Sequence, residues 1–220
     1  MRIGAFELPE PVPTLREPHA LTMIRPWVDV GNVGTLTLQR LERHFRAQPL
    51  GQLARPGTFF DFTRYRPTTR LVSGQREVTS PNTVVKYAQP AEGPGLIFLH
   101  LLEPHAMAED YVDSVLELLD YFKVQVYCRI GAMYDSVPHT RPLVVSVNPG
   151  SVEPRPGVPV PPLQTRQSQY DGPTTILNTL ADTVAKRGLG NMSLMARLPH
   201  YAQLDEDFAG TARMIEVLSA

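Results

Sequence analysis

The chain has 220 residues, a formal net charge of −1 and a sequence pI near 6.6. This length fits one α/β domain spanning residues 1–220, and the balanced charge offers no basic field for nucleic acid or an anionic membrane as an obligate partner. The single cysteine, Cys128, excludes an intrachain disulfide and fits the cytoplasm, and no apolar run reaches the roughly 20 residues of a membrane span.

The first third of the chain predicts a lead-in, a strand and a helix. Residues 1–20 contain four prolines and no sustained periodicity, which predicts an irregular lead-in on the surface. Residues 21–25 are expected to form a strand, and apolar residues at helical spacing follow from Val33 to Phe45. The Gly-x-x-Gly turn at residues 31–34 is consistent with an anion cradle, but close packing of the helix on a strand also requires glycine and is favoured.

Between residues 59 and 88 the sequence pattern becomes typical of β-strands. Short runs at 59–62, 70–73, 76–79 and 83–88 predict strands, with Ser73-Gly74 as a hairpin turn. We therefore expect an antiparallel hairpin excursion from an α/β core.

The second half alternates strands and helices. The continuous apolar run at 95–102 is typical of a strand buried in a parallel sheet, and a helix at 111–122 leads to a strand at 124–130, which makes a βαβ unit. A strand at 143–147 precedes residues 149–166, whose six prolines predict a loop or linker. A capped helix beginning near residue 173, a strand at 191–197 and a final helix complete the chain.

Polar motifs follow four of the predicted strands, after residues 25, 102, 130 and 197. Because the carboxyl ends of parallel strands share one edge of an open sheet, we expect these motifs to converge on one crevice. The candidate ligand-binding residues are Asp29, Gly31, Asn32, Gly34, Glu103, His105, Asp135, His139, Thr140, Arg141, Gly172, Thr174, His200 and Tyr201.

The run Val-Pro-His-Thr-Arg-Pro at residues 137–142 is the most distinctive of these motifs. Its two prolines restrict the backbone around His139 and Arg141. Arg141 could pair bidentately with a carboxylate or phosphate, while His139, His105 and His200 could carry protons. The alternative is a buried polar network that ties the loops together without a ligand.

Several motifs in order resemble the proteasome assembly chaperone 2 family. These are Trp-Val-Asp-Val-Gly-Asn-Val-Gly at 27–34, Phe-Phe-Asp-Phe-Thr-Arg-Tyr-Arg-Pro at 59–67, Glu-Pro-His at 103–105, the 137–142 run, Tyr-Asp-Gly-Pro-Thr at 170–174 and Pro-His-Tyr at 199–201. The resemblance extends from about residue 20 to the C-terminus.

The resemblance implies a three-layer α/β/α fold with a mostly parallel sheet, similar to that of purine nucleoside phosphorylases. It also implies homo-oligomers, with a trimer favoured, and a protein partner, since eukaryotic relatives are chaperones for proteasome α-subunit rings. Relatives that bind proteasomes can end in a hydrophobic-Tyr-x tail, whereas this chain ends Val-Leu-Ser-Ala, so we do not expect capture by that route.

Two functions are open at this point. The first is a protein-binding, assembly chaperone-like or scaffold protein, because the sequence has no nucleophile–base motif, no metal-ligand spacing and no phosphate loop with its lysine, and so predicts no metal and no cofactor. The second is an enzyme or small-molecule binder that takes a nucleoside-, phosphate- or carboxylate-bearing ligand in the crevice.

Overall fold

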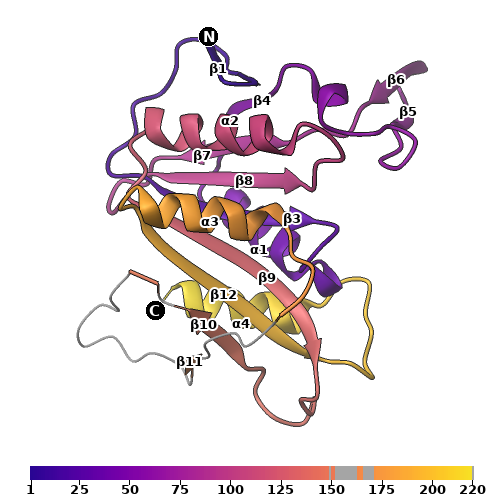
Figure 1. Ribbon diagram of the computed structural model, residues 1–220. Coiled ribbons are helices and arrows are strands. Elements are labelled where there is room, and N and C mark those ends of the chain that lie inside the picture. Colours follow the sequence, from indigo (N-terminus) through magenta and orange to yellow (C-terminus); the bar gives the residue numbers. More distant parts are fainter. Residues whose placement is uncertain (149, 152–162, 166–170, 220) are drawn as a thin grey trace.

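A large mixed β-sheet runs through the molecule, and α-helices flank it (Figure 1). The computed structural model describes residues 1–148, 150–151, 163–165 and 171–219. In this part of the chain the sheet has ten strands, in the order β1-β2-β4-β7-β8-β3-β9-β12-β10-β11. Their bounds are β1 Arg2–Ile3, β2 Phe6–Glu7, β3 His19–Arg25, β4 Gln48–Leu53, β7 Val84–Ala88, β8 Leu96–Leu102, β9 Val126–Asp135, β10 Val145–Asn148, β11 Leu163–Thr165 and β12 Gly190–Pro199.

The centre of the sheet is parallel and most of its flanks are antiparallel. Strands β8, β3, β9 and β12 are neighbours and run in the same direction, as the apolar runs predicted. Strands β7, β4, β2 and β1 continue antiparallel on one side, and β10 pairs antiparallel with β12 on the other. The sheet is therefore mixed, with a parallel core, and the α/β class is confirmed.

Four α-helices were expected, and α1–α4 match them. Their bounds are α1 Val33–His44, α2 Ala108–Tyr121, α3 Ile176–Lys186 and α4 Phe208–Leu218. None of the helices in the described residues is long and apolar enough to cross a membrane. Helix α3 begins at Ile176 rather than near residue 173, because Thr175 is its N-cap and accepts a hydrogen bond from the amide of Leu177 at 3.2 Å.

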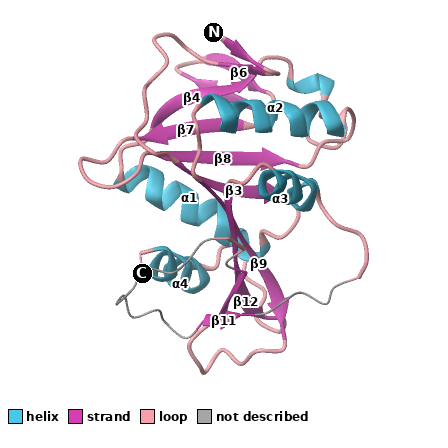
Figure 2. Cartoon of the chain, turned by 60° about the vertical axis from the view of Figure 1, so that its left-hand side comes forward, coloured by secondary structure: helices cyan, strands magenta, loops and turns pink. Residues whose placement is uncertain are grey.

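Two clusters of buried apolar side chains hold the helices to the sheet. One contains residues of α2 and α3, and the other contains residues of α1 and α4. Neighbouring residues of β3 alternate between them, since Ala20 belongs to the first cluster and Leu21 to the second. Figure 2 shows α2 and α3 on one side of the central strands and α1 and α4 on the other.

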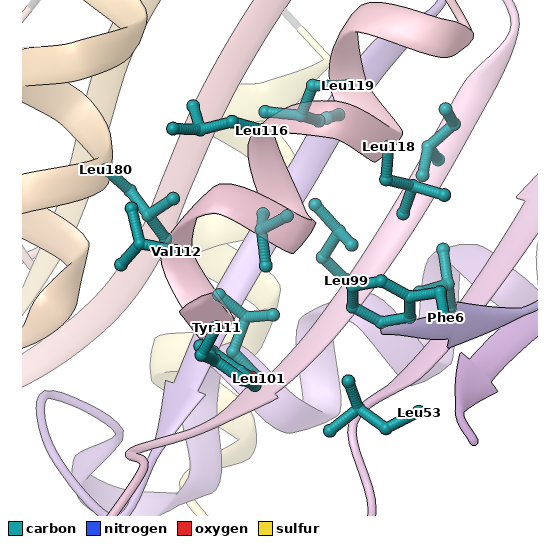
Figure 3. Packing of buried hydrophobic residues seen from close by; sticks show 14 of the residues in the cluster. Phe6, Leu53, Leu99, Leu101, Tyr111, Val112, Leu116, Leu118, Leu119 and Leu180 are labelled. Atoms are coloured by element: carbon teal, nitrogen blue, oxygen red, sulfur yellow. The ribbon is translucent and has the colours of Figure 1, made fainter. Parts of the chain in front are cut away.

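The first cluster is dense around α2. Leu99 and Leu101 of β8 face Tyr111 and Leu118 of α2, and none of these four side chains is more than 1% exposed (Figure 3). The hydroxyl of Tyr111 is 2.6 Å from that of Thr83, so the one polar group of this ring is satisfied inside the core. Each such side chain contributes about 1.5–3 kcal/mol by leaving water.

Two local expectations were wrong, and one strand was not predicted. Residues 1–20 are not simply an irregular surface lead-in, because β1 and β2 form a hairpin that joins the sheet and buries Phe6. Residues 59–62 form no strand: they follow a 3-10 turn at Pro56–Thr58, and the ring of Phe59 packs edge-on against Tyr111 at 5.3 Å. Strand β4 was not predicted, since its sequence includes a proline and a glycine.

The predicted hairpin at 70–79 is confirmed, but it stands apart from the main sheet. Strands β5 (Thr68–Val72) and β6 (Gln75–Thr79) pair only with each other in the described residues. The expected Pro-rich loop at 149–166 lies mostly outside the described residues. Within this segment, residues 163–165 form β11, which pairs in parallel with β10.

The only cysteine, Cys128, is buried in β9. Burial raises the pKa of its thiol to about 12, so the reactive thiolate is scarcely populated near neutral pH. Cys128 is therefore a core residue, as its apolar surroundings in the sequence indicated.

A buried carboxylate, Glu42 of α1, links the helix to the sheet. Its Oε2 accepts a hydrogen bond from Nζ of Lys86 at 2.6 Å, and its Oε1 is hydrogen-bonded to Nε2 of His100. Burial alone would raise the pKa of Glu42, but the hydrogen bonds from His100 and Lys86 outweigh it and hold the pKa below its ordinary value of 4.5. The charged form of Glu42 thus stabilises the fold.

We expect Glu42→Gln to lower the free energy of unfolding by about 2 kcal/mol at pH 7, because two charge-assisted hydrogen bonds are weakened. A depressed folded-state pKa contributes stability above the unfolded value, and this is lost as the pH falls through the folded-state pKa. The difference between the two proteins should therefore shrink in acid.

Urea unfolding of both proteins at pH 7 and near pH 3.5 measures this. Glu92→Gln, at an exposed loop position, is the control and should change stability little at either pH. A difference for Glu42→Gln that stays constant with pH would show that the carboxylate charge is not the stabilising feature.

Candidate functional site

The four candidate motifs follow neighbouring strands, but the strands end at different heights. The end of β3, Arg25, lies beside Leu102 at the end of β8. Strands β9 and β12 pair in register as far as Asp135 and Pro199. Asp29, just beyond β3, bridges Ala132, so β9 continues about 10 Å farther at roughly 3.3 Å per residue. The motifs therefore fall into two groups.

In the first group, Asp29 caps the start of α1. Its Oδ1 accepts hydrogen bonds from the amides of Gly34 at 2.7 Å and Thr35 at 3.2 Å, and its Oδ2 accepts one from the Thr35 hydroxyl at 2.6 Å. Burial raises the pKa of Asp29, and these hydrogen bonds oppose that rise. The amide of Gly34, a candidate anion donor, is thus already occupied by a carboxylate of the same chain.

Gly31 and Asn32 join this start to the segment before α4. The Asn32 side chain donates to the carbonyl of Asp205 at 2.7 Å, and the carbonyl of Gly31 accepts from the amide of Asp207 at 2.8 Å. A Cβ at Gly34 would lie 2.9 Å from Asp29 Oδ1 and 3.2 Å from a carbonyl of β9. The Gly-x-x-Gly turn therefore serves close packing, the interpretation that the sequence favoured.

Glu103, just beyond β8, links that strand to α3. Its Oε1 accepts a hydrogen bond from the amide of Ile176 at 3.1 Å, while Oε2 is buried without a hydrogen-bond partner in the described residues. Burial raises the pKa of Glu103, and the Ile176 amide offsets part of that effect. The nearby candidate Thr174 accepts from the Asn178 side chain, and Gly172 is exposed.

His105 belongs with the segment at 57–65 rather than with the later motifs. Its Nδ1 accepts from the amide of Asp61 at 3.2 Å, and its ring lies 4.5 Å from that of Tyr65, whose hydroxyl donates to the Glu103 carbonyl at 3.0 Å. His105 lines a hollow of about 310 Å³ with residues 57–61, Arg64 and Ala106. This hollow lies at the end of β8.

The second group surrounds the far ends of β9 and β12. The hydroxyl of Tyr201 accepts a hydrogen bond from the amide of His139 at 2.9 Å and lies 3.0 Å from Nδ1 of the same residue. The amide of His200 donates to the carbonyl of Asp135 at 3.3 Å, and the Asp135 carboxylate is 3.9 Å from the Arg197 guanidinium. These contacts tie the 137–142 run to the segment after β12.

Arg141 lines a second hollow, of about 550 Å³, together with His139, Pro142, Leu143 and three residues of α4. One of these, Arg213, donates from Nε to the Leu143 carbonyl at 3.0 Å and pairs with Glu216 at 2.5 Å. Thr140 lies in the same exposed loop. Two guanidinium groups against one carboxylate make this hollow cationic.

Large apolar side chains are exposed in the segment that leads from Tyr201 into α4, next to the second hollow. Tyr201, Leu204 and Phe208 are 55%, 55% and 65% exposed. Tyr201 contacts His139 of the hollow, and Phe208 precedes its lining residue Ala209 in α4. We call Tyr201, Leu204 and Phe208, together with His139 and Arg141, the partner face.

The sequence missed part of this face. Leu204, Phe208 and Arg213 were not candidates, because helical periodicity assigned Phe208 to the core side of the last helix. The signal that could have identified Phe208 is its place immediately after Asp207, the residue that caps α4 by accepting from the amide of Gly210 at 2.7 Å. A residue at the first position of a helix comes before the positions that the helix buries, so its side chain can remain exposed.

No group of three or more His, Cys, Asp or Glu side chains is arranged to hold a metal ion in the part of the chain that the structure describes. The histidines at 105 and 139 line different hollows, and Asp29, Glu103 and His200 line neither of the two. The residues expected in one crevice therefore do not share either of these hollows.

Comparison with known proteins identifies the class. The PAC2 family profile matches residues 23–220, so the chain belongs to the PAC2 family. No curated protein sequence gave a significant match.

Solved structures agree on the fold. A PAC2 family protein from Streptomyces avermitilis superimposes with a TM-score of 0.79 at 24% identity, covering 92% of this chain and 84% of that one. A proteasome-assembly chaperone homologue from Mycobacterium tuberculosis gives 0.75 at 22% identity, covering 91% and 85%. The archaeal proteasome activator PbaB from Pyrococcus furiosus gives 0.73 at 13% identity, covering 100% and 88%.

The Tyr201 contact yields a test of how the 137–142 run is held. We expect Tyr201→Phe to make the backbone amide of His139 exchange with solvent roughly tenfold faster, because the amide loses its acceptor. Global stability should change by less than about 1 kcal/mol, since both residues are exposed. Amide exchange followed by NMR measures both, with Tyr134→Phe as the control. Unchanged protection at His139 would contradict this contact.

Glu103 provides a pH-dependent test. Its folded-state pKa is raised, so its charge destabilises the folded protein increasingly as the pH rises through that value, and this effect is absent in acid. We expect Glu103→Gln to be more stable, relative to wild type, at pH 7.5 than at pH 4. Thermal unfolding at both pH values measures this, with Glu92→Gln as an exposed control. A difference that does not change with pH would contradict burial of the charge.

Proposed function

We propose that the protein binds protein partners as an assembly chaperone-like or scaffold protein of the PAC2 family. The observation that carries the proposal is the partner face, where Tyr201, Leu204 and Phe208 are exposed in a segment that contacts a cationic hollow through Tyr201 and His139. Clustered aromatic side chains with an arginine are the composition of binding hot spots, and exposing them to water without a partner is unfavourable. Arg141 and Arg213 suit a partner that presents a carboxylate beside an apolar residue.

Family relationships support a protein partner. One structural neighbour is described as a proteasome-assembly chaperone homologue and another as a proteasome activator. Proteasomal α-subunits of the host are accordingly the first partner to test. We further propose that the protein acts in the cytoplasm and as a homo-oligomer, with a trimer favoured.

The architecture is proposed to be the three-layer α/β/α type similar to purine nucleoside phosphorylases. Support comes from the two core clusters, which contain the side chains of different helix pairs. We do not extend the proposal to enzymatic activity or small-molecule binding, since the residues that would form one catalytic crevice lie in separate places.

We expect Phe208→Ser and Tyr201→Ala each to weaken partner binding at least tenfold, about 1.4 kcal/mol, while Arg141→Ala weakens it less, because rim charges contribute little. Crosslinking in the host identifies candidate partners, and calorimetry with each purified partner, α-subunits first, measures affinity. Trp27→Ala is the control, since Trp27 is 60% exposed but lies after β3. Equal affinities for all four variants would refute the partner face.

A further inference from the structure

The β5–β6 hairpin projects from the molecule without any covering element (Figure 1). All ten of its strand residues are exposed, including Leu71 at 79% and Val78 at 63%. The register pairs Thr69 with Val78 and Leu71 with Arg76, so Leu71 and Val78 lie diagonally on one face. A two-stranded hairpin alone is marginally stable in water, and this apolar face gains from being covered.

The charge of this hairpin indicates what would cover it. Residues 64–79, which we call the arginine arm, contain Arg64, Arg66, Arg70 and Arg76 but only one acid, Glu77. Arg64 pairs with Asp61 at 3.7 Å. Among the described residues, no ion pair of Arg70 or Arg76 is formed. Arg76 shares the face of Leu71 and Val78, whereas Arg70 lies on the other face of the hairpin, opposite Glu77. The arm therefore combines an apolar patch with cations that are available for pairing.

A complementary surface is present on α2. The helix contains no lysine or arginine, and its exposed positions between 109 and 120 are all acidic. These positions are Glu109, Asp110, Asp113, Glu117 and Asp120, which we call the acidic face; Asp120 also pairs with Arg187 of the same chain. Their spacing of three and four residues places the last four along one side of the helix. Exposed apolar residues, Met107 and Tyr121, stand at its two ends.

We infer that the arginine arm of one copy of the chain docks on the acidic face of a second copy. Both surfaces are exposed in a single chain, so the arm does not cover its own α2. Pairing two arms would oppose arginine to arginine, and pairing two acidic faces would oppose carboxylate to carboxylate. Only the arm-to-helix contact brings opposite charges together, and it also covers Leu71 and Val78.

This contact connects different surfaces of the two copies. It can be formed twice in a dimer, with each arm on the other copy, or once per neighbour in a closed ring. Figures 1 and 2 show the arm and α2 toward one end of the molecule and α4, which contributes to the partner face, toward the other, so the proposed contact and the partner face are separate surfaces. The inference rests on the proposed self-association but not on the partner face.

The test uses charge reversal in the full chain. We expect Arg70→Glu with Arg76→Glu, and separately Asp113→Lys with Glu117→Lys, each to weaken self-association at least tenfold in sedimentation-velocity measurements over a range of protein concentrations. Sodium chloride at 0.5 M should weaken wild-type association similarly. Arg40→Glu with Arg43→Glu, a matched pair on exposed positions of α1, should have little effect.

Two rescues make the test specific. A mixture of the arm-reversed and helix-reversed proteins contains complementary charges in both directions and should recover association as a dimer or an even-numbered ring, whereas a ring of three would keep one repulsive contact. A single chain with all four substitutions should also recover it. Recovery in both cases excludes misfolding as the reason for the loss in the separate variants.

The apolar part of the contact is tested by Leu71→Ser with Val78→Ser. This variant should associate at least tenfold more weakly, and its thermal unfolding under dilute, monomeric conditions should match wild type, because both side chains are exposed. A wild-type protein that remains monomeric at high concentration would overturn self-association itself. An oligomer that persists in both charge-reversed variants would overturn only the arm-to-helix contact.

Discussion

Strands β9 and β12 pair in parallel along ten residues, from Gly190 beside Val126 to Pro199 beside Asp135. Their neighbour β3 stays in register with β9 only as far as Thr22 and Arg129. Because β9 and β12 extend farther than β3, the segments that follow them lie beyond the end of the sheet's other parallel strands. This difference in length separates the 137–142 run from the turn at Asp29, and it brings that run against the start of α4 instead.

Much of the architecture was readable from the sequence because local pattern and tertiary role agree. The apolar run of β8, the amphipathic α2 and the Ser73-Gly74 hairpin turn each have one interpretation. Strand β4 was missed because Pro49 and Gly51 break its pattern, and it is held by β2 and β7 rather than by its own propensity. Phe59 and Phe60 led to the opposite error, a predicted strand that is absent. They are buried because they pack on α2, not because they lie in a strand.

For the candidate residues, the sequence indicated their places after strands but not how they are arranged relative to one another. That Asp29, His105 and His139 follow strands could be read from the chain, because strand ends are marked by a change from apolar to polar residues. How far each strand extends past its neighbour depends on hydrogen bonding between segments that are far apart in the sequence. Short sequence patterns do not contain that information, so one expected crevice became two separate regions with different chemistry.

The inaccessibility of Cys128 has a practical meaning for studying this protein. Since the chain's single thiol is enclosed in β9 and is almost wholly protonated near neutral pH, a maleimide reagent would leave the folded protein unmodified. Any cysteine introduced on the surface would then be the one reactive position. The natural protein is accordingly a ready background for placing a single fluorophore or spin label and following its movements by spectroscopy.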